Sequence, residues 1–161
     1  MNFKIDHKFW KNKKVFITGH TGFKGSWFSI FLTYLGAEVT GYSLKPSTKP
    51  SLFVLANVKK IIKKSIISDV KKFTKLESEI KKSNATILFH LAAQPLVIES
   101  YKEPLKTLTT NIIGTANLLE SIRNIKSIKS VVIITTDKVY KIKKDNKLYK
   151  ELDQLGGFDP Y

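Results

Sequence analysis

Three consecutive polar residues, Thr136, Asp137 and Lys138, combine side chains that suit proton transfer. They follow the apolar run 131–135, so a hydroxyl, a carboxylate and an amine stand side by side where a buried strand is expected to end. The hydroxyl can hydrogen-bond a substrate oxygen, and adjacent acidic and basic groups suit general acid–base catalysis. An ordinary polar turn is the alternative, but the position at a strand end favours a catalytic set.

A second group of residues has the spacing of an anion-binding turn. Gly19, Gly22 and Gly25 are three residues apart, directly between an apolar strand pattern and a helix pattern. The first glycine allows a tight turn, the second lets the backbone approach a pyrophosphate, and the third lets the helix pack close to the sheet. A merely structural turn is the alternative. We assign the turn to dinucleotide binding through Gly19, Thr21, Gly22, Phe23, Lys24 and Gly25.

The next two expected strand ends carry candidates for the adenosine half of a dinucleotide. No carboxylate ends the second strand, where Ser43 could hydrogen-bond a ribose hydroxyl and Lys45 could favour a 2′-phosphate. The choice between NAD and NADP therefore stays open on chemistry alone. Asp69, which we assign to the cofactor together with Val70, can reach the adenine edge from the third strand. Its alternative role is to cap a helix that starts at Lys71.

Small residues follow the fourth expected strand, where the backbone can run close beneath a ribose or nicotinamide. Four residues of this segment are assigned to the cofactor: Leu91, Ala92, Ala93 and Gln94. We expect His90 to be a packed histidine at the strand end. Thr110 and Asn111 lie within a predicted helix although neither is a good helix former, which indicates hydrogen bonds to a loop or to the cofactor. Thr110 is counted among the cofactor residues.

The elements that position these groups alternate along the chain. Short apolar runs predict strands at 14–18, 38–43, 65–69, 86–91 and 131–135, and amphipathic or apolar stretches predict helices at 22–35, 71–82 and 101–125. Strands separated by helices are connected by crossovers, which give a parallel sheet with helices on both faces. The fold class is therefore α/β, a doubly wound parallel sheet of the Rossmann type, here incomplete.

Composition excludes several other classes of protein. The 161 residues are 42% hydrophobic and 25% charged, enough for one core, and no long uncharged apolar run or signal-peptide pattern occurs. Cysteine is absent, so thiolate metal sites and disulfides are excluded, and we expect no metal site. These features predict a soluble, cytoplasmic domain with no membrane partner.

The formal charge of +15 suggests a polyanion partner, but its distribution favours a solvated surface. Lys and Arg number 28 against 13 acidic residues, and Arg123 is the only arginine. Specific readers of nucleic acid depend on the planar fork of arginine, and the lysines here are scattered along the whole chain. We therefore expect no specific nucleic-acid partner and keep nonspecific polyanion binding as an alternative function.

Taken together, the motifs resemble the extended short-chain dehydrogenase/reductase family. That family carries TGxxGxxG after its first strand, an HLAA-type fourth strand and a Thr/Ser–Tyr–Lys catalytic set. Within the family the chain looks most like the nucleotide-sugar 4,6-dehydratases that act on CDP-glucose, from about Phe9 to its last residue. The similar stretches are 15–27, 35–44, 50–53, 90–97, 110–111, 114–115, 136–138 and 156–161.

This resemblance implies NAD as the cofactor and a role for each catalytic candidate. Tyr161 would be the base that takes the proton from the sugar 4-hydroxyl, and Thr136 would hydrogen-bond that oxygen. Asp137 would protonate the departing 6-hydroxyl. Lys138 would be a candidate for the C5 proton, which requires a neutral lysine. The resemblance also implies a homo-oligomer and a product used for deoxysugars of surface polysaccharides such as the O-antigen of lipopolysaccharide.

The chain departs from the family pattern after Tyr161. The family's lysine four residues later would be position 165, and a nucleotide-sugar domain would follow. We therefore expect residues 1–161 to be the N-terminal part of an NAD-binding domain, inactive alone. The alternatives are another nucleotide-sugar dehydratase or epimerase, or a Rossmann module that binds dinucleotide without turnover.

Overall fold

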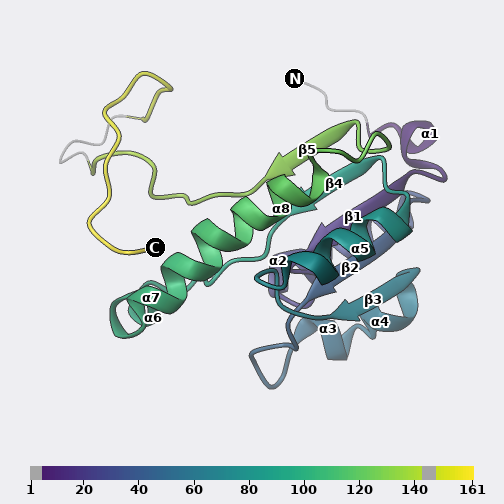
Figure 1. Ribbon diagram of the computed structural model, residues 1–161, viewed down its shortest axis with the longest axis horizontal. Coiled ribbons are helices and arrows are strands. Elements are labelled where there is room, and N and C mark those ends of the chain that lie inside the picture. Colours follow the sequence, from purple (N-terminus) through teal and green to yellow (C-terminus); the bar gives the residue numbers. More distant parts are fainter. Residues whose placement is uncertain (1–4, 143–147) are drawn as a thin grey trace.

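The computed structural model describes residues 5–142 and 148–161, and its centre is a five-stranded parallel sheet (Figure 1). The strands are β1 (Lys14–Thr18), β2 (Glu38–Ser43), β3 (Lys64–Ile67), β4 (Ile87–His90) and β5 (Ser130–Ile133). Their order across the sheet is β3-β2-β1-β4-β5, and every neighbouring pair is parallel. The chain winds in one direction from β1 to β3 and in the other from β1 to β5, so the predicted doubly wound sheet is confirmed.

Helices cover both faces of this sheet. One face packs against α2 (Phe23–Tyr34), α3 (Leu52–Leu55) and α4 (Val58–Ile61). The other packs against α5 (Phe73–Ser83) and α8 (Gly114–Ile122), which lie side by side over the strands in Figure 1. Three further helical segments, α6 (Val97–Lys102), α7 (Pro104–Leu108) and the π-helical turn η1 (Thr109–Ile113), lead into α8, and α1 (His7–Trp10) precedes β1.

The position of β1 at the centre of the sheet explains why its apolar residues are consecutive rather than alternating. Val15 and Ile17 belong to the core on the α2 face, whereas Phe16 belongs to the core on the α5 face. All three side chains are almost completely buried. A parallel strand with helices on both sides must be apolar at every position, which is the pattern seen in the sequence.

Among the predicted elements, the helix at 101–125 differs most from the structure. Helical structure begins earlier, at Val97, and breaks at Glu103 before Pro104 starts α7. Proline fits the first position of a helix because its missing N–H would have had no helical partner there. The turn Thr109–Ile113 is then π-helical rather than α-helical. The bounds of β1 and β2 are those predicted, whereas the bounds of β3, β4 and β5 differ by one or two residues. The four-residue helices are too short to show a period.

Within residues 5–142 and 148–161, no helix is long and apolar enough to cross a membrane. After β5, the described residues 134–142 and 148–161 contain no helix or strand and run away from the sheet (Figure 1). They lead toward the α6–α7 end of the helical arm, which comprises α6, α7, η1 and α8. An isolated antiparallel bridge between Tyr140 and Leu155 closes part of this segment on itself.

Candidate functional site

The predicted site residues gather at one edge of the sheet because all five strands point the same way. The glycine turn follows β1, Ser43 is the last residue of β2, and Asp69 follows β3. The segment 91–94 follows β4, and the Thr-Asp-Lys triplet follows β5. In doubly wound sheets ligands bind outside this carboxyl edge, at the point where the strand order reverses. Here the reversal falls at β1, where the glycine turn is.

The geometry of the glycine turn fits a dinucleotide phosphate. Gly19 has φ +79°, and a Cβ there would lie 2.7–2.8 Å from the backbone of Leu91 and Ala92. A Cβ on Gly25 would lie 2.1 Å from the Gly19 carbonyl oxygen, so α2 packs directly on the turn. A Cβ on Gly22 would meet only the Gly19 carbonyl oxygen, at 3.4 Å, and no side chain caps the first N–H groups of α2. These groups remain available to an anion.

A hydrogen bond joins the hydroxyl groups of Thr21 and Ser43, and a second bond of Thr21 determines which hydroxyl donates. The Thr21 hydroxyl donates its single proton to the carbonyl of Leu44 at 2.8 Å. Its oxygen lies 2.9 Å from Ser43 Oγ, so the Ser43 hydroxyl must donate in that pair. Ser43 is buried and has only its lone pairs left, so it can accept a hydrogen bond from a ribose hydroxyl but cannot donate one.

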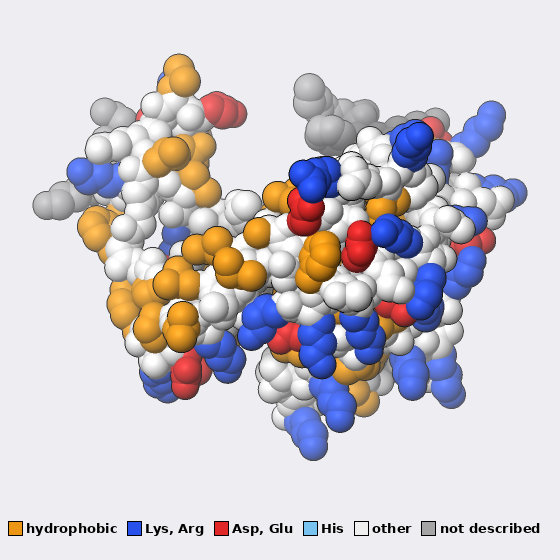
Figure 2. All heavy atoms as spheres, in the orientation of Figure 1, with side chains coloured by type: hydrophobic (Ala, Val, Ile, Leu, Met, Phe, Trp, Pro, Cys, Tyr) orange, Lys and Arg blue, Asp and Glu red, His pale blue; other side chains and the backbone are white. Residues whose placement is uncertain are grey.

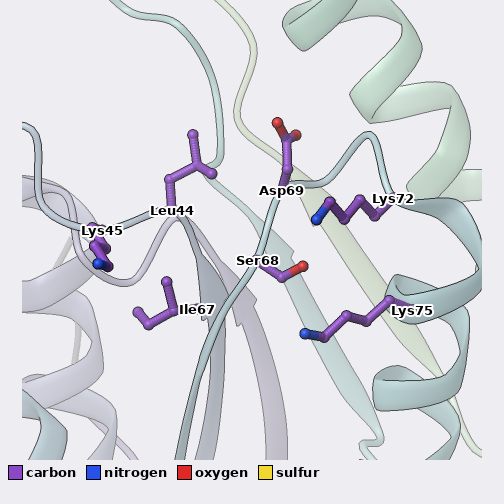
Figure 3. Close-up of a pocket in the computed structure, with 7 residues that line it drawn as sticks. All are labelled: Leu44, Lys45, Ile67, Ser68, Asp69, Lys72 and Lys75. Carbon is purple, nitrogen blue, oxygen red and sulfur yellow. The ribbon is translucent and has the colours of Figure 1, made fainter.

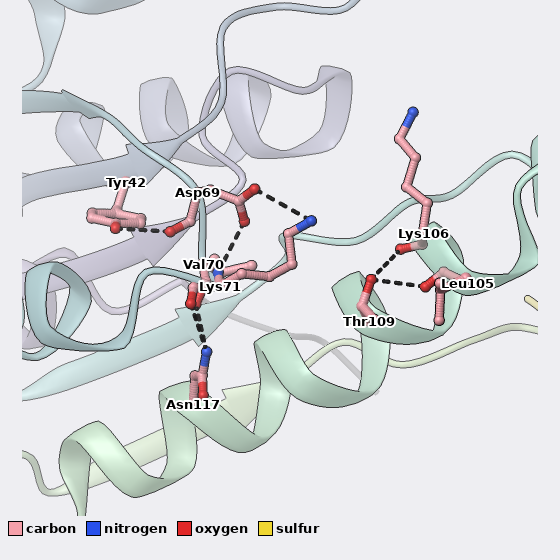
Figure 4. A network of polar contacts seen from close by, with 8 residues as sticks. All are labelled: Tyr42, Asp69, Val70, Lys71, Leu105, Lys106, Thr109 and Asn117. Carbon is pink, nitrogen blue, oxygen red and sulfur yellow. Dashed lines mark hydrogen bonds and ion pairs between the residues drawn. The ribbon is translucent and has the colours of Figure 1, made fainter.

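Asp69 and Val70 lie in a loop that is held from two sides (Figure 4). Tyr42 donates its phenol proton to the Asp69 carbonyl at 3.0 Å, and Asn117 of α8 donates to the carbonyls of Val70 and Lys71. The Asp69 carboxylate accepts the Lys71 N–H at 2.9 Å. The loop therefore presents a fixed carboxylate at the end of β3.

The alternative role of Asp69 as a helix cap is wrong. Helix α5 begins at Phe73, its N-cap is Lys72, and no side chain caps it. Asp69 is too far upstream and instead closes a turn onto Lys71. Burial raises the pKa of the neighbouring Tyr42 phenol, so this donor stays protonated.

His90 is the packed histidine that the sequence predicts, and its hydrogen bonds define its tautomer. Thr18 Oγ1 accepts the N–H groups of Leu91 and Ala92, each at 3.2 Å, so its proton is free for His90 Nδ1 at 2.7 Å. Nε2 must then carry the ring proton and donate to Thr115 Oγ1 at 3.1 Å. The ring is neutral, and burial lowers the pKa of His90 to about 4.

The same network fixes the segment after β4. Asn111 accepts the Gln94 N–H at 2.8 Å and donates to the Gln94 carbonyl at 3.2 Å, which confirms the expected bond to a loop. The N–H groups of Leu91, Ala92 and Gln94 are thus used within the protein. Thr110, in the same π-helical turn, is half-buried.

The catalytic candidates line one hollow of about 640 Å³. Thr136, Asp137 and Lys138 enter it from the end of β5, Tyr161 from the last described segment, and Lys24 from the first turn of α2. The glycine turn and the triplet therefore border the same space. Thr136 Oγ1 accepts the Lys138 N–H at 3.0 Å, which leaves its hydroxyl proton free to donate to a ligand.

A carboxylate that contacts two residues of this hollow is not among the residues predicted from the sequence. Asp159, which is mostly buried, accepts from Lys138 Nζ at 3.0 Å and from the Tyr161 N–H at 3.1 Å. A single carboxylate thus ties the lysine to the tyrosine. Asp159 lies in an irregular segment 21 residues from Lys138, and no pattern in the sequence indicates that they meet.

His20, within the glycine turn, was also missed. Its ring is completely buried, burial lowers its pKa to about 4, and Nε2 lies 2.7 Å from Ser65 Oγ. The ring occupies the space where a Cβ on Gly41 would be, with atoms 2.3–2.7 Å from that position. Gly41 therefore makes room for a histidine that anchors the turn to β2 and β3.

Comparison with known proteins agrees with this geometry. Residues 16–161 match the family model described as GDP-mannose 4,6 dehydratase. A CDP-glucose 4,6-dehydratase of Salmonella typhimurium is 47% identical over 157 residues, covering 98% of this chain and 44% of that protein. The chain therefore spans less than half the length of this relative.

Two solved structures have a fold similar to that of this chain. The UDP-glucose-4-epimerase of Stenotrophomonas maltophila, solved with NAD and formylated UDP-arabinopyranose, superposes with a TM-score of 0.78 at 21% identity, covering 93% of this chain and 44% of that one. MoeE5, solved with UDP-glucose and NAD, gives a TM-score of 0.72 at 25% identity over 92% of this chain and 44% of its own.

The doubly wound sheet, the glycine turn at its switch point and the polar triplet after β5 define the extended short-chain dehydrogenase/reductase class. Within this class the chain belongs to the GDP-mannose 4,6 dehydratase family. The family resemblance expected from the motifs is thereby confirmed, with the dehydratase type favoured by the Salmonella relative.

Proposed function

We propose that these residues form the cofactor-binding half of a CDP-glucose 4,6-dehydratase, which converts CDP-D-glucose to CDP-4-dehydro-6-deoxy-D-glucose and water. One observation carries the proposal: the triplet Thr136-Asp137-Lys138 and Tyr161 line the same hollow as the first turn of α2. The 47% identity to a protein of that activity supports the choice of substrate. A nucleotide-sugar epimerase is the nearest rival within the family, supported by the likeness in fold.

The cofactor we propose is NAD, held by the glycine turn, Ser43, Asp69, Val70, the segment 91–94 and Thr110. The missing side chain at Gly22 and the uncapped start of α2 fit its pyrophosphate. NAD held there would supply a hydride acceptor for sugar C4 and a hydride donor for C6.

The side chains of the hollow supply the proton transfers. Tyr161 accepts the proton of the 4-hydroxyl, while the free hydroxyl proton of Thr136 hydrogen-bonds the same oxygen. The resulting ketone acidifies the C5 proton, so water can be eliminated across C5–C6. Asp137, in its acid form, donates the proton that leaves with the 6-hydroxyl. The C5 proton needs a separate acceptor, and a proton must return to C5 when the hydride adds to C6.

Lys138 is a weaker candidate for that acceptor than the sequence suggests. Its ammonium group is paired with Asp159 at 3.0 Å, and an ammonium has no lone pair for a proton. We propose that Lys138 acts in this arrangement as a charged donor near the substrate, and that a base role requires release from Asp159.

Because the chain covers 44% of the Salmonella relative, we propose the complete reaction only for a protein with further residues. These would include a lysine four positions after Tyr161, which lowers the tyrosine pKa in the family, and a nucleotide-sugar domain. Residues 1–161 alone would bind dinucleotide without turnover. We further propose a cytoplasmic homo-oligomer whose product feeds deoxysugar synthesis for surface polysaccharides.

The test begins with the reading frame beyond the Tyr161 codon, which should encode lysine at position 165 and a further domain. The encoded protein is then given CDP-glucose deuterated at C4. A dehydratase moves the deuterium to C6 of a 4-keto product, whereas an epimerase returns it to C4. A stop codon directly after Tyr161 would contradict turnover by this protein.

Variants of the same protein test the residue roles. Tyr161→Phe and Asp137→Asn should each lower kcat by about 100-fold or more, since general acid–base catalysis contributes roughly 10²–10⁴-fold. Tyr34→Phe, at an exposed tyrosine near the end of α2, is the matched control and should keep full activity. Full activity of Tyr161→Phe would rule out the proposed base.

A further inference from the structure

The segment from Gly156 to Tyr161 contains no helix or strand and is held by residues that are distant in sequence. The Gly156 N–H donates to the carbonyl of Val139 at 3.0 Å. Tyr101 of α6 donates its hydroxyl proton to the carbonyl of Phe158 at 3.1 Å. The segment is therefore attached both to the residues that follow β5 and to the helical arm.

Asp159 adds a third attachment, which reaches the catalytic candidates themselves. Its Oδ2 accepts from Lys138 Nζ at 3.0 Å, and its Oδ1 accepts from the Tyr161 N–H at 3.1 Å. The side chain is only 11% exposed, so little water competes for these oxygens. Because the two partners bind different oxygens, the contact requires a carboxylate. The amide of asparagine has the same shape but a single acceptor oxygen, so it can keep only one of the two bonds.

These bonds form a continuous series along the hollow of about 640 Å³. The Lys138 N–H donates to Thr136 Oγ1 at 3.0 Å, and the ammonium group of the same lysine leads on to Asp159 and Tyr161. An ammonium group has three N–H donors, so the described contacts leave two of them for a ligand. The pairing also restrains a long and flexible side chain. Asp159 therefore determines where the Lys138 charge lies relative to Tyr161.

The carboxylate of a second hollow has a more local role (Figure 3). This hollow, of about 550 Å³, lies between the ends of β2 and β3 and the start of α5, and Asp69 belongs to its lining. Asp69 accepts the Lys71 N–H at 2.9 Å and lies 3.6 Å from Lys71 Nζ, so both contacts are to one nearby residue. Asp159 instead joins Lys138, 21 residues away, to the segment of Tyr161. Its loss would change how two segments lie relative to each other.

We infer that Asp159 is a positioning residue of the proposed dehydratase: its carboxylate holds the Lys138 ammonium group and the Tyr161 backbone in one arrangement, so that both side chains meet the same sugar. The inference rests on the proposed function and adds a residue to it. Asp159 exchanges no proton with the substrate and acts only through its two partners. Its effect should fall on the rate of the reaction, since a misplacement of about 1 Å can lower a rate about 100-fold.

Steady-state kinetics of the complete encoded protein with CDP-glucose test the inference. Asp159→Asn should lower kcat by about 10- to 100-fold, because it releases one of two positioned groups. The KM for CDP-glucose should change less than about threefold, since uniform binding of the substrate is not affected. Asp159→Glu keeps two acceptor oxygens and should restore kcat to about fivefold above that of Asp159→Asn.

A matched control and a double variant separate positioning from a general effect of lost charge. Glu77→Gln removes a carboxylate that accepts from Lys81 Nζ at 2.8 Å on α5, outside the hollow, and should keep full activity. In a Lys138→Met background, Asp159→Asn should lower kcat by a smaller factor than in the unaltered protein. One of its two partners is then gone, and the effects of residues in contact are not additive.

Three results would overturn the inference while the dehydratase function stands. They are full activity of Asp159→Asn, a loss confined to KM, and an equal factor for Asp159→Asn with and without Lys138. A different result tests the function on which the inference rests. If the unaltered protein does not move deuterium from C4 to C6 of the sugar, the proposed function falls and the inference with it.

Discussion

At the residue scale, His90 is the side chain whose protonation state is most tightly defined. Its Nδ1 accepts from Thr18 and its Nε2 donates to Thr115, so a second ring proton would leave two donors facing each other. Thr18 cannot turn its proton away without losing one of its two backbone donors, Leu91 or Ala92. Charging this histidine would therefore disturb the segment beneath the proposed nicotinamide site.

This network predicts a loss of stability in mild acid. Burial lowers the pKa of His90 and of His20 from 6.5 to about 4, so the unfolded chain binds more protons between pH 6.5 and 4. The free energy of unfolding must then fall as the pH falls through this window, by about 1.2 kcal/mol per pH unit for each histidine near pH 5. Urea unfolding at several pH values between 6.5 and 5 measures this slope.

His90→Gln separates the two contributions, because glutamine does not titrate. The slope near pH 5 should fall to about half its original value, whatever the change in stability at pH 7. Ser47→Ala, which replaces an exposed residue and alters no titratable group, is the control and should leave the slope unchanged. A slope that is the same in His90→Gln as in the unaltered protein would show that this ring is not held neutral.

At the element scale, the π-helical turn η1 connects the helical arm to the segment after β4. Asn111 makes two hydrogen bonds with the Gln94 backbone, and Thr115, one turn later, accepts from His90. The π-helical turn is wider than an α-helical turn, and it places Asn111 against the segment that contains Gln94. Helix α8 then continues across the face of the sheet. We expect η1 to hold segment 91–94, which we propose binds the cofactor, in its position.

Asn111→Ala tests that role. It removes both bonds to Gln94 and should lower the free energy of unfolding by about 1–3 kcal/mol, since a buried polar group left unpaired costs that much. Amide hydrogen exchange of residues 91–96 should become faster. Ile112→Ala, an exposed neighbour in the same turn, should leave exchange in this segment unchanged. Unaltered exchange in Asn111→Ala would contradict the coupling of η1 to the segment.

The elements also show what could be predicted from the sequence. The strands were predictable because β1 is buried on both faces and β-branched, and the glycine turn because Gly19 and Gly25 tolerate no side chain. Asn111 was identified because an amide inside a helix is unusual. The pairing of Asp159 with Lys138 was not predictable, since it joins two irregular segments without periodicity. The π-helical turn likewise leaves no mark in residue composition.

At the scale of the whole molecule, the helical arm carries a row of exposed apolar side chains, of which Tyr101 also donates its hydroxyl proton to the Phe158 carbonyl at 3.1 Å. Ile98, Tyr101, Leu105, Leu108 and Ile112 recur at intervals of three and four residues, and all are exposed. Figure 2 shows apolar side chains gathered at this end of the molecule, while lysines dominate the surface over the sheet. Exposed apolar patches of this kind mark protein contacts, and the three–four spacing is typical of paired helices.

The proposed homo-oligomer should therefore form through this arm. Sedimentation velocity at tens of micromolar protein should show a dimer of the 161-residue chain. The double variant Leu105→Lys and Ile112→Lys should raise the dissociation constant of this dimer at least tenfold, because an ammonium group is costly to bury without a partner. Leu152→Lys, at a fully exposed leucine away from the arm, is the control and should leave the dimer intact. If the double variant associates as strongly as the unaltered chain, the arm is not the interface. A chain that is monomeric throughout this range would contradict an interface on the arm.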